Sequence, residues 1–288
     1  MKFREKIAQG KFVITSEIGP AKGTDMHVHL EDAELLRGKV DALNVTDLQS
    51  SVMRFGSLAM CRLLVEKGHE PIFQLTCRDR NRLALQSDLL SAWTLGIENA
   101  LLLTGDHPKL GDHPQARSVF DVDSMQLLQI ASTLNSGKDM NGNALLGKPD
   151  LFLGAVVNPG ADPLELEIIK MEKKIRAGAK FFQTQAVYDV GAFEKFISAA
   201  KALNAMIMVG IVLLKSAGMA KYMNKNVSGV FVPDSLIKEM ETTQDKRAKS
   251  VEIAARLIKE LRPMCQGVHI MPIGWDKLVP QVIVAAGL

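Results

Sequence analysis

Residues 151–185 read LFLGAVVNPGADPLELEIIKMEKKIRAGAKFFQTQ, and they contain one complete unit of the predicted fold. A continuous apolar run, Leu151–Val157, is followed by an amphipathic stretch, Pro163–Ala177, and by a second apolar run, Ala179–Thr184. Continuous apolar runs of this length are typical of parallel strands buried on both faces, and Gly178 stands where a helix stops. The segment therefore predicts a strand, a helix and a parallel strand.

The same alternation extends along the chain. The eight predicted strands are Phe12–Ile18, Ala42–Val45, Pro71–Leu75, Ala100–Leu103, Leu151–Val157, Ala179–Thr184, Met206–Val212 and Val268–Met271. Between them the apolar periodicity predicts helices over Gly56–Lys67, Asn81–Leu95, Val122–Leu134, Pro163–Ala177, Gly191–Leu203 and Lys246–Leu261. Such an alternation indicates a parallel α/β fold.

The spacing of the strands favours a barrel. Most strand ends follow one another by roughly 25 to 30 residues, the length of one strand–helix unit, and two intervals are about twice as long. Eight strands predict a single (β/α)8 TIM barrel over residues 1–288, with insertions after strands 4 and 7, in preference to an open sheet. Val230–Val232 is a further strand-like run within the second insertion, and it leaves the strand count open.

Composition excludes several classes of protein. The 288 residues are 47% hydrophobic and 23% charged, as in soluble globular proteins, and no apolar run approaches the roughly 20 residues of a membrane helix. The charged N-terminus has no apolar segment behind it, so we expect no secretory signal and a cytoplasmic location. The net charge of +3 comes from interspersed residues without a basic block, which argues against nucleic-acid binding.

Sequence motifs for self-contained cofactor sites are missing. Cys61, Cys77 and Cys265 lie far apart, so we expect buried free thiols and neither a disulfide framework nor a metal cluster. The glycines match neither the dinucleotide-binding turn nor the loop that binds nucleoside triphosphates.

Polar side chains gather where the predicted strands end. The carboxyl ends of barrel strands carry the active site in proteins of this fold, so these side chains are expected to share one rim. A single Thr or Asn there is more simply a cap of the following turn, but a carboxylate such as Glu17 on an apolar strand is costly to bury unless it is paired or protonated. The groups are Thr15–Glu17, Asn44–Asp47, Gln74–Thr76, Thr104–Asp106, Asn158–Gly160 and Gln183–Gln185.

One alternative is a metal-dependent barrel hydrolase built on the His27-Val28-His29 pair. Such a site needs further ligands on later strands, and no histidine falls between strands five and seven. The other alternative is a non-catalytic barrel subunit that binds its ligand for a partner complex.

The rim motifs, taken in order, resemble the methylenetetrahydrofolate reductase family over nearly the whole chain. The motifs that carry the resemblance are Ser16–Pro20, Asn44–Asp47, Leu75–Asp79, Leu102–Asp106 and Gly178–Gln185 with Tyr188-Asp189. The resemblance implies a flavin-dependent TIM barrel that reduces 5,10-methylenetetrahydrofolate to 5-methyltetrahydrofolate by hydride transfer from flavin N5. It implies FAD as cofactor, with FMN as the alternative, and no metal.

The resemblance also assigns roles to residues. Glu17 matches the general acid, which an apolar setting would keep protonated near neutral pH. Asp106 matches a catalytic aspartate beside flavin and folate, where a negative charge stabilises a cationic intermediate, and Gln185 matches a glutamine that binds the pterin. The implied cofactor-binding positions are Thr46, Gln74, Thr104, Gly105, Asp106, Asn158, Glu167 and Lys174; for Lys174 a solvated helix face is an equal alternative.

The chain departs from the family in the loop after strand seven. Members that use a nicotinamide directly carry an aromatic residue there, whereas Leu214–Gly218 contains none. This difference puts direct NAD(P)H oxidation in doubt and predicts an accessory or electron-donating protein subunit, and hence an oligomer. The expected small-molecule partner is the tetrahydrofolate substrate.

Overall fold

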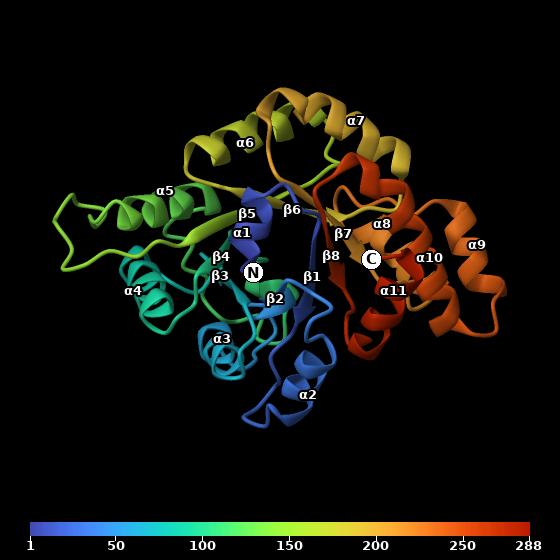
Figure 1. The fold of residues 1–288 in the computed structure, drawn as a ribbon, viewed down its shortest axis with the longest axis horizontal. Helices are drawn as coiled ribbons and strands as arrows, with labels where there is room; N and C mark the ends of the chain where they lie inside the picture. Colours follow the sequence, from blue (N-terminus) through green and yellow to red (C-terminus); the bar gives the residue numbers. More distant parts are fainter.

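The computed structural model describes residues 1–288 and is built around a closed barrel of parallel strands (Figure 1). The strands are β1 (Val13–Ile18), β2 (Ala42–Val45), β3 (Pro71–Thr76), β4 (Asn99–Leu103), β5 (Phe152–Val157), β6 (Phe181–Ala186), β7 (Ile207–Val212) and β8 (Gly267–Met271). Each strand pairs with the next, and β8 pairs with β1. The predicted (β/α)8 barrel is therefore confirmed.

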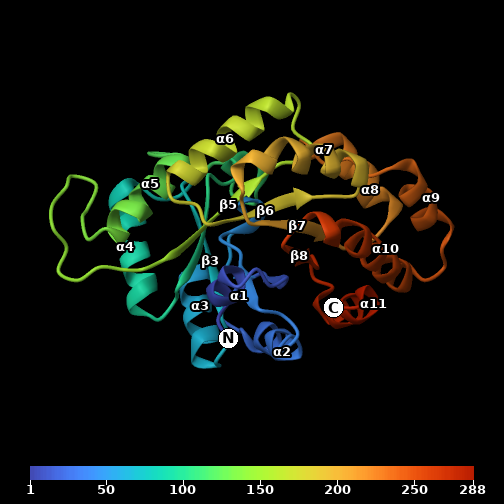
Figure 2. The same ribbon diagram turned by 45° about the horizontal axis from the view of Figure 1, so that its top comes forward.

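Helices surround the barrel, and the segment between α5 and β5 projects from it as a long loop (Figure 2). The helices are α1 (Phe3–Ala8), α2 (His27–Leu35), α3 (Ser57–Glu66), α4 (Arg82–Thr94), α5 (Ser124–Asn135), α6 (Leu164–Arg176), α7 (Val190–Ala200), α8 (Ala217–Asn226), α9 (Asp234–Thr242), α10 (Lys246–Leu261) and α11 (Val279–Ala286). The two insertions lie where they were predicted, between β4 and β5 and between β7 and β8. None of these helices combines the length and the apolar character needed to cross a membrane.

The strand-like run Val230–Val232 forms no strand, so that interpretation was wrong. Its residues lead into α9, and Val230 and Val232 are buried. The side chain of Asn224 donates to the carbonyl of Val232 at 2.9 Å and accepts from its amide at 2.6 Å. The side chain of Asn224 thus makes the hydrogen bonds with the backbone of Val232 that a neighbouring strand would make if this run were part of a sheet.

The barrel interior is arranged in layers because alternate residues of a strand face the same side. The amino-terminal layer is apolar and contains Phe3, Val13, Ala42, Ile72, Leu101, Phe181 and Met208. Two residues further along the strands, the next layer is polar and contains Thr15, Asn44, Gln74, Gln183 and His269. The third layer, at the carboxyl ends, contains Glu17, Thr46, Thr76, Gln185 and Met271.

Helix α1 closes the amino-terminal end of the barrel. Phe3 is fully buried and meets Phe181 and Phe152 edge to face, with ring centroids 5.3 and 6.1 Å apart. Its backbone amide donates to the carboxylate of Glu70 at 3.0 Å. The opposite end of the barrel stays open and carries the polar layers.

Candidate functional site

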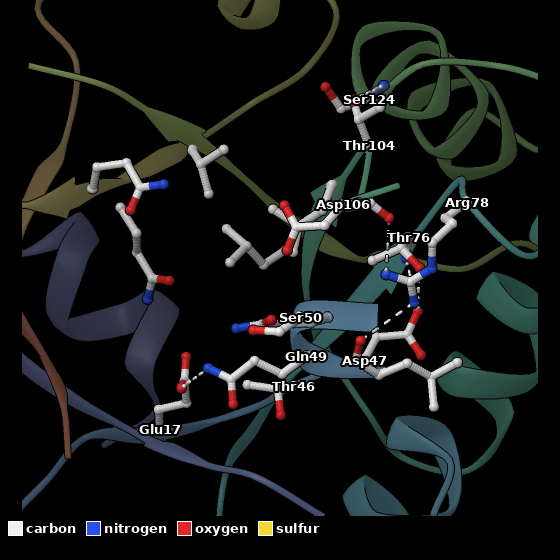
Figure 3. A pocket seen from close by; sticks show the side chains of 18 of the residues that line it. Glu17, Thr46, Asp47, Gln49, Ser50, Thr76, Arg78, Thr104, Asp106 and Ser124 are labelled. Atoms are coloured by element: carbon white, nitrogen blue, oxygen red, sulfur yellow. Dashed lines mark hydrogen bonds between the residues drawn. The ribbon is translucent and has the colours of Figure 1, made fainter. Parts of the chain in front are cut away.

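A cavity of about 510 Å³ opens at the carboxyl ends of the strands (Figure 3). This is within the range of small-molecule sites. Sequence-predicted residues that line it are Glu17, Thr46, Gln74, Thr104, Gly105, Asp106, Lys174 and Gln185. The predicted rim residues thus come from β1, β2, β3, β4 and β6 or the turns that follow them, and Lys174 comes from α6. The predicted group after β5, Asn158–Gly160, does not line the cavity.

A buried hydrogen-bond network forms the floor beneath the cavity. Asn44 donates to Gln183 at 2.7 Å, and Gln183 donates back to Asn44 at 3.0 Å. Thr15 and His269 are joined between Oγ1 and Nδ1 at 2.9 Å, and Gln183 reaches Thr15 at 3.4 Å. Every member is buried, so these mutual bonds satisfy polar groups that would otherwise be costly to bury.

Glu17 lies just above this floor and is 8% exposed. Gln49 donates to its Oε1 at 2.9 Å, and Nε2 of His269 lies 3.9 Å from its Oε2. The prediction that Glu17 has apolar surroundings is therefore wrong, because an amide and an imidazole flank its carboxyl group. His269 was assigned no role from the sequence, although the alternation of residues along β8 places it in the polar layer.

Asp47 is a second carboxylate in the cavity wall, but both of its oxygens already accept hydrogen bonds from other residues. It accepts from the amide and hydroxyl of Thr76 at 2.9 and 2.7 Å, and Arg80 binds it through two nitrogens at 2.7 and 3.2 Å. Arg80 also pairs with Asp88 at 2.8 Å. Asp47 thus joins β2 to the segment after β3.

Asp106 follows β4 and is exposed at the mouth of the cavity. Gly105, just before it, has a φ of +91°, and a Cβ there would lie 3.1 Å from the Cβ atoms of Thr76 and Arg78. Thr104 accepts a hydrogen bond from the backbone amide of Ser124 at 3.2 Å. A side chain at position 105 would therefore be strained, and glycine suits the turn that places Asp106 at the mouth of the cavity.

Two of the predicted cofactor positions lie outside the cavity lining. Asn158 donates to the carbonyl of Ser228 at 3.1 Å, so it holds the loop after β5 to the second insertion. The carboxylate of Glu167 accepts from the amide of Asn158 at 3.0 Å. Both residues thus stabilise the turn between β5 and α6.

Lys174 does reach the cavity from α6. It is 9% exposed, and its ammonium donates to the carbonyl of Val156 at 2.7 Å. Burial lowers the pKa of Lys174, and the charge of Glu167 acts in the opposite direction. A solvated helix face, the alternative for this residue, is therefore wrong.

The cavity offers one buried polar atom that nothing in the chain satisfies. Oγ1 of Thr46 has no hydrogen-bond partner, although the residue is only 2% exposed and lines the cavity. Buried hydroxyls are normally paired, so this atom is free to bind a ligand. Together with the amide of Gln74 and the cation of Lys174, Thr46 fits a flavin, which carries carbonyl oxygens, ring nitrogens and phosphate.

The His27 and His29 pair does not form part of this site. Both residues lie on α2, where His27 is exposed and His29 is half-buried, and His27 lies 3.3 Å from Glu31 of the same helix. No group of three or more His, Cys, Asp or Glu side chains is arranged to hold a metal ion. The three cysteines are buried and free, as expected.

The segment after β8 places an aromatic side chain beside the loop after β7. The ammonium of Lys215 lies 5.6 Å from the ring centroid of Trp275, and the guanidinium carbon of Arg247 lies 5.9 Å from it. The sequence indicated no such pairing, because Trp275 follows a different strand.

A (β/α)8 barrel with a polar cavity at the carboxyl ends of its strands defines a protein of the TIM-barrel class. The sequence profile of methylenetetrahydrofolate reductase matches residues 2–287. The chain belongs to the methylenetetrahydrofolate reductase family.

Individual relatives agree with this assignment. Methylenetetrahydrofolate reductase 2 of Schizosaccharomyces pombe is 26% identical to this chain over an alignment of 312 residues. The alignment covers 99% of this chain and 47% of that protein. The 5,10-methylenetetrahydrofolate reductase of Pectobacterium carotovorum is 26% identical over 193 residues, 65% of this chain and 59% of that protein. The chain therefore matches only about half the length of these curated relatives.

A solved structure shares the fold. It is an uncharacterised protein from Clostridium thermocellum that binds two copies of 5-methyl-5,6,7,8-tetrahydrofolic acid. The TM-score is 0.62 at 20% identity, and the match covers 98% of this chain and 96% of that one.

Proposed function

We propose that this protein reduces 5,10-methylenetetrahydrofolate to 5-methyltetrahydrofolate with a bound flavin. The observation that carries the proposal is one cavity lined by Glu17, Asp106 and Gln185 and by Thr46, whose hydroxyl has no hydrogen-bond partner. Family membership supports the same reaction, and the Clostridium thermocellum protein binds the compound that is the product in this proposal.

Residues of the chain would hold the cofactor on one side of the cavity. Four residues of the cavity lining offer suitable groups: the hydroxyl of Thr46, the side-chain amide of Gln74, the backbone of Gly105, which a ligand can approach closely, and the ammonium of Lys174. FAD is the proposed cofactor, with FMN as the alternative. When bound and reduced, the flavin would supply the hydride that converts the one-carbon unit to a methyl group.

Glu17 supplies the proton in this proposal. Opening the five-membered ring breaks the bond between the methylene carbon and N10, and the electron pair left on N10 takes a proton from the Glu17 carboxyl. Gln49 occupies Oε1 by donating to it, so Oε2 is the oxygen that carries the proton. The other nitrogen, N5, then forms a cationic iminium with the methylene carbon.

Asp106 stabilises that cation. Its carboxylate lies at the mouth of the cavity, where a fixed negative charge lowers the energy of a positive centre that develops during the reaction. Gln185 carries an amide that is able to hydrogen-bond the pterin ring. The cationic iminium intermediate accepts the hydride at its methylene carbon, and the product leaves as 5-methyltetrahydrofolate.

The variant Glu17→Gln tests the proposal. We expect wild-type and variant protein to bind FAD alike, as seen by visible absorbance after desalting. In a single turnover, the chemically reduced variant should reduce 5,10-methylenetetrahydrofolate at least about a hundredfold more slowly, because only the proton donor is lost. Glu31→Gln, on the exposed surface of α2, is the matched control and should react at the wild-type rate. Wild-type turnover by Glu17→Gln would reject the mechanism.

The electrons for the flavin come from outside the chain, and we propose an accessory or electron-donating subunit as their source. The support is the loop Leu214–Gly218, which carries no aromatic side chain on which a nicotinamide could stack. Mixing the flavin-loaded protein anaerobically with NADH or NADPH tests this proposal. Rapid bleaching of the flavin by either nucleotide alone would contradict it.

A further inference from the structure

Arg78 is a buried cation two residues after the end of β3, and the proposed mechanism gives it no role. It is 2% exposed and lines the cavity. Its Nε and Nη2 donate to the carboxylate of Asp79 at 2.9 and 2.7 Å, so its charge is compensated locally.

The remaining donors of Arg78 connect two loops. Nη2 donates to the carbonyl of Leu48 at 3.4 Å, and Nη1 donates to Oγ of Ser51 at 3.1 Å. Nη1 also reaches the carbonyl of Asp106 at 3.4 Å, and Ser51 donates to that carbonyl at 2.8 Å. Figure 3 shows Arg78 lying between Asp106 and the turn that carries Ser50. One side chain thus joins the loops that follow β2 and β4.

The loop after β2 needs such support. Leu48, Ser50 and Ser51 have φ values of 47°, 54° and 58°, in the left-handed region that non-glycine residues rarely adopt. Conformations of this kind persist only where surrounding contacts hold them. Gly111 is packed so closely here that a Cβ on it would lie 1.9 Å from the carbonyl oxygen of Ser51.

The backbone of Arg78 holds the loop after β4 at a second point. Its carbonyl accepts a hydrogen bond from the amide of Val119 at 2.7 Å. Its Cβ lies 3.1 Å from the position that a Cβ on Gly105 would take. Arg78 therefore contacts this loop near both ends, at the carbonyl of Asp106 and at the amide of Val119.

We propose that Arg78 is a positioning residue that holds Asp106 over the cavity through the Asp106 carbonyl. Its role in the reaction rests on the proposed function, whereas its role in the loop does not. Because a methionine side chain fills similar space without donors, Arg78→Met removes the three loop contacts and keeps the packing.

Hydrogen exchange of the unliganded protein tests the loop. In Arg78→Met we expect the amides of residues 105–112 to exchange about tenfold faster, as local opening becomes easier. Arg82→Met is the matched control, because Arg82 lies four residues further on and anchors Asp121 at 2.8 Å outside the cavity. It should leave residues 105–112 unchanged. Ser51→Ala removes one of the two donors to the Asp106 carbonyl, so it should increase the exchange rate of these amides by a smaller factor. It replaces Arg78→Met in the experiment if that variant does not fold. Unchanged exchange in a folded Arg78→Met, or in Ser51→Ala if that is the variant that folds, overturns the proposal.

A double-mutant cycle tests the link to Asp106. Asp106→Asn should raise the midpoint potential of bound FAD, because a negative charge is lost. Arg78→Met should shift it in the same direction and slow single-turnover reduction by up to about a hundredfold. If Arg78 acts through Asp106, adding Arg78→Met to Asp106→Asn should change neither quantity further. Fully additive effects overturn the role of Arg78 in the reaction. If the wild type binds no FAD, the proposed function fails, and the exchange experiment still decides the loop contact.

Discussion

At the scale of single residues, the partners of a carboxylate decide what it can do. Glu17 and Asp47 both follow the apolar part of a strand and line the same cavity. Asp47 is neutralised by Arg80 and bonded to Thr76, whereas Glu17 accepts a hydrogen bond only from Gln49, at Oε1, and its Oε2 accepts none. The sequence identified Glu17 as the candidate acid, but it could not show that Asp47 is occupied.

Asp276 provides a residue-scale prediction about pH. Burial raises its pKa, the charges of Asp32 and Glu17 raise it further, and His29 acts in the opposite direction. The folded state therefore binds this proton more tightly than the unfolded state. The resulting stability is fully present below the ordinary aspartate value of about 3.8 and is lost as the pH rises through the raised pKa.

Replacing the group with a neutral amide removes this pH dependence. We expect Asp276→Asn to increase the free energy of unfolding relative to wild type, and the increase should grow between about pH 4 and pH 7.5. Urea unfolding of both proteins across that range measures it. A difference that stays constant with pH would show that the carboxyl does not titrate abnormally in the folded protein.

At the scale of elements, strands were predicted more accurately than helices. All eight strands lie within about two residues of their predicted bounds, because strands buried on both faces are continuously apolar. Helices α2, α8, α9 and α11 were not predicted, and the N-terminal stretch that forms α1 is charged and helix-like in sequence. Helix α11 contains Val-Pro-Gln-Val-Ile-Val, a composition that favours a strand, and its helical state depends on packing against α10.

The paired amides of β2 and β6 provide an element-scale prediction. Asn44→Leu leaves the amide of Gln183 buried without its partner, so we expect a loss of about 1–3 kcal/mol in the free energy of unfolding. Gln183→Met should cost a similar amount, for the same reason. The double variant should cost less than the sum, because both polar groups are gone. Urea unfolding of the four proteins measures the coupling, and strictly additive losses would mean that the two amides are satisfied independently.

At the scale of the whole molecule, the two ends of the barrel have different roles. Helix α1 and the phenylalanines Phe3, Phe152 and Phe181 close the amino-terminal end. The polar layers and the cavity occupy the carboxyl end. In this fold the first end serves stability and the second carries the chemistry.

Truncating Phe3 should separate these roles. Phe3→Ala empties a fully buried site, and we expect it to lower the free energy of unfolding by about 3–5 kcal/mol. FAD binding measured under native conditions should remain at the wild-type affinity, because the cavity lies at the other end. Phe231→Ala is the control, since Phe231 is 57% exposed and its loss should change stability by less than about 0.5 kcal/mol. A weakened FAD affinity in folded Phe3→Ala would contradict the separation.

The sequence alone determined the barrel and the end at which its polar residues meet, because apolar runs and their spacing are local properties of the chain. The tertiary structure decided which of those polar residues are engaged with one another. Gln49 bonds Glu17, Arg80 neutralises Asp47, and Arg78 holds the carbonyl of Asp106. These contacts join side chains from different strands and loops, so they depend on barrel closure and strand register, which no local pattern in the sequence records.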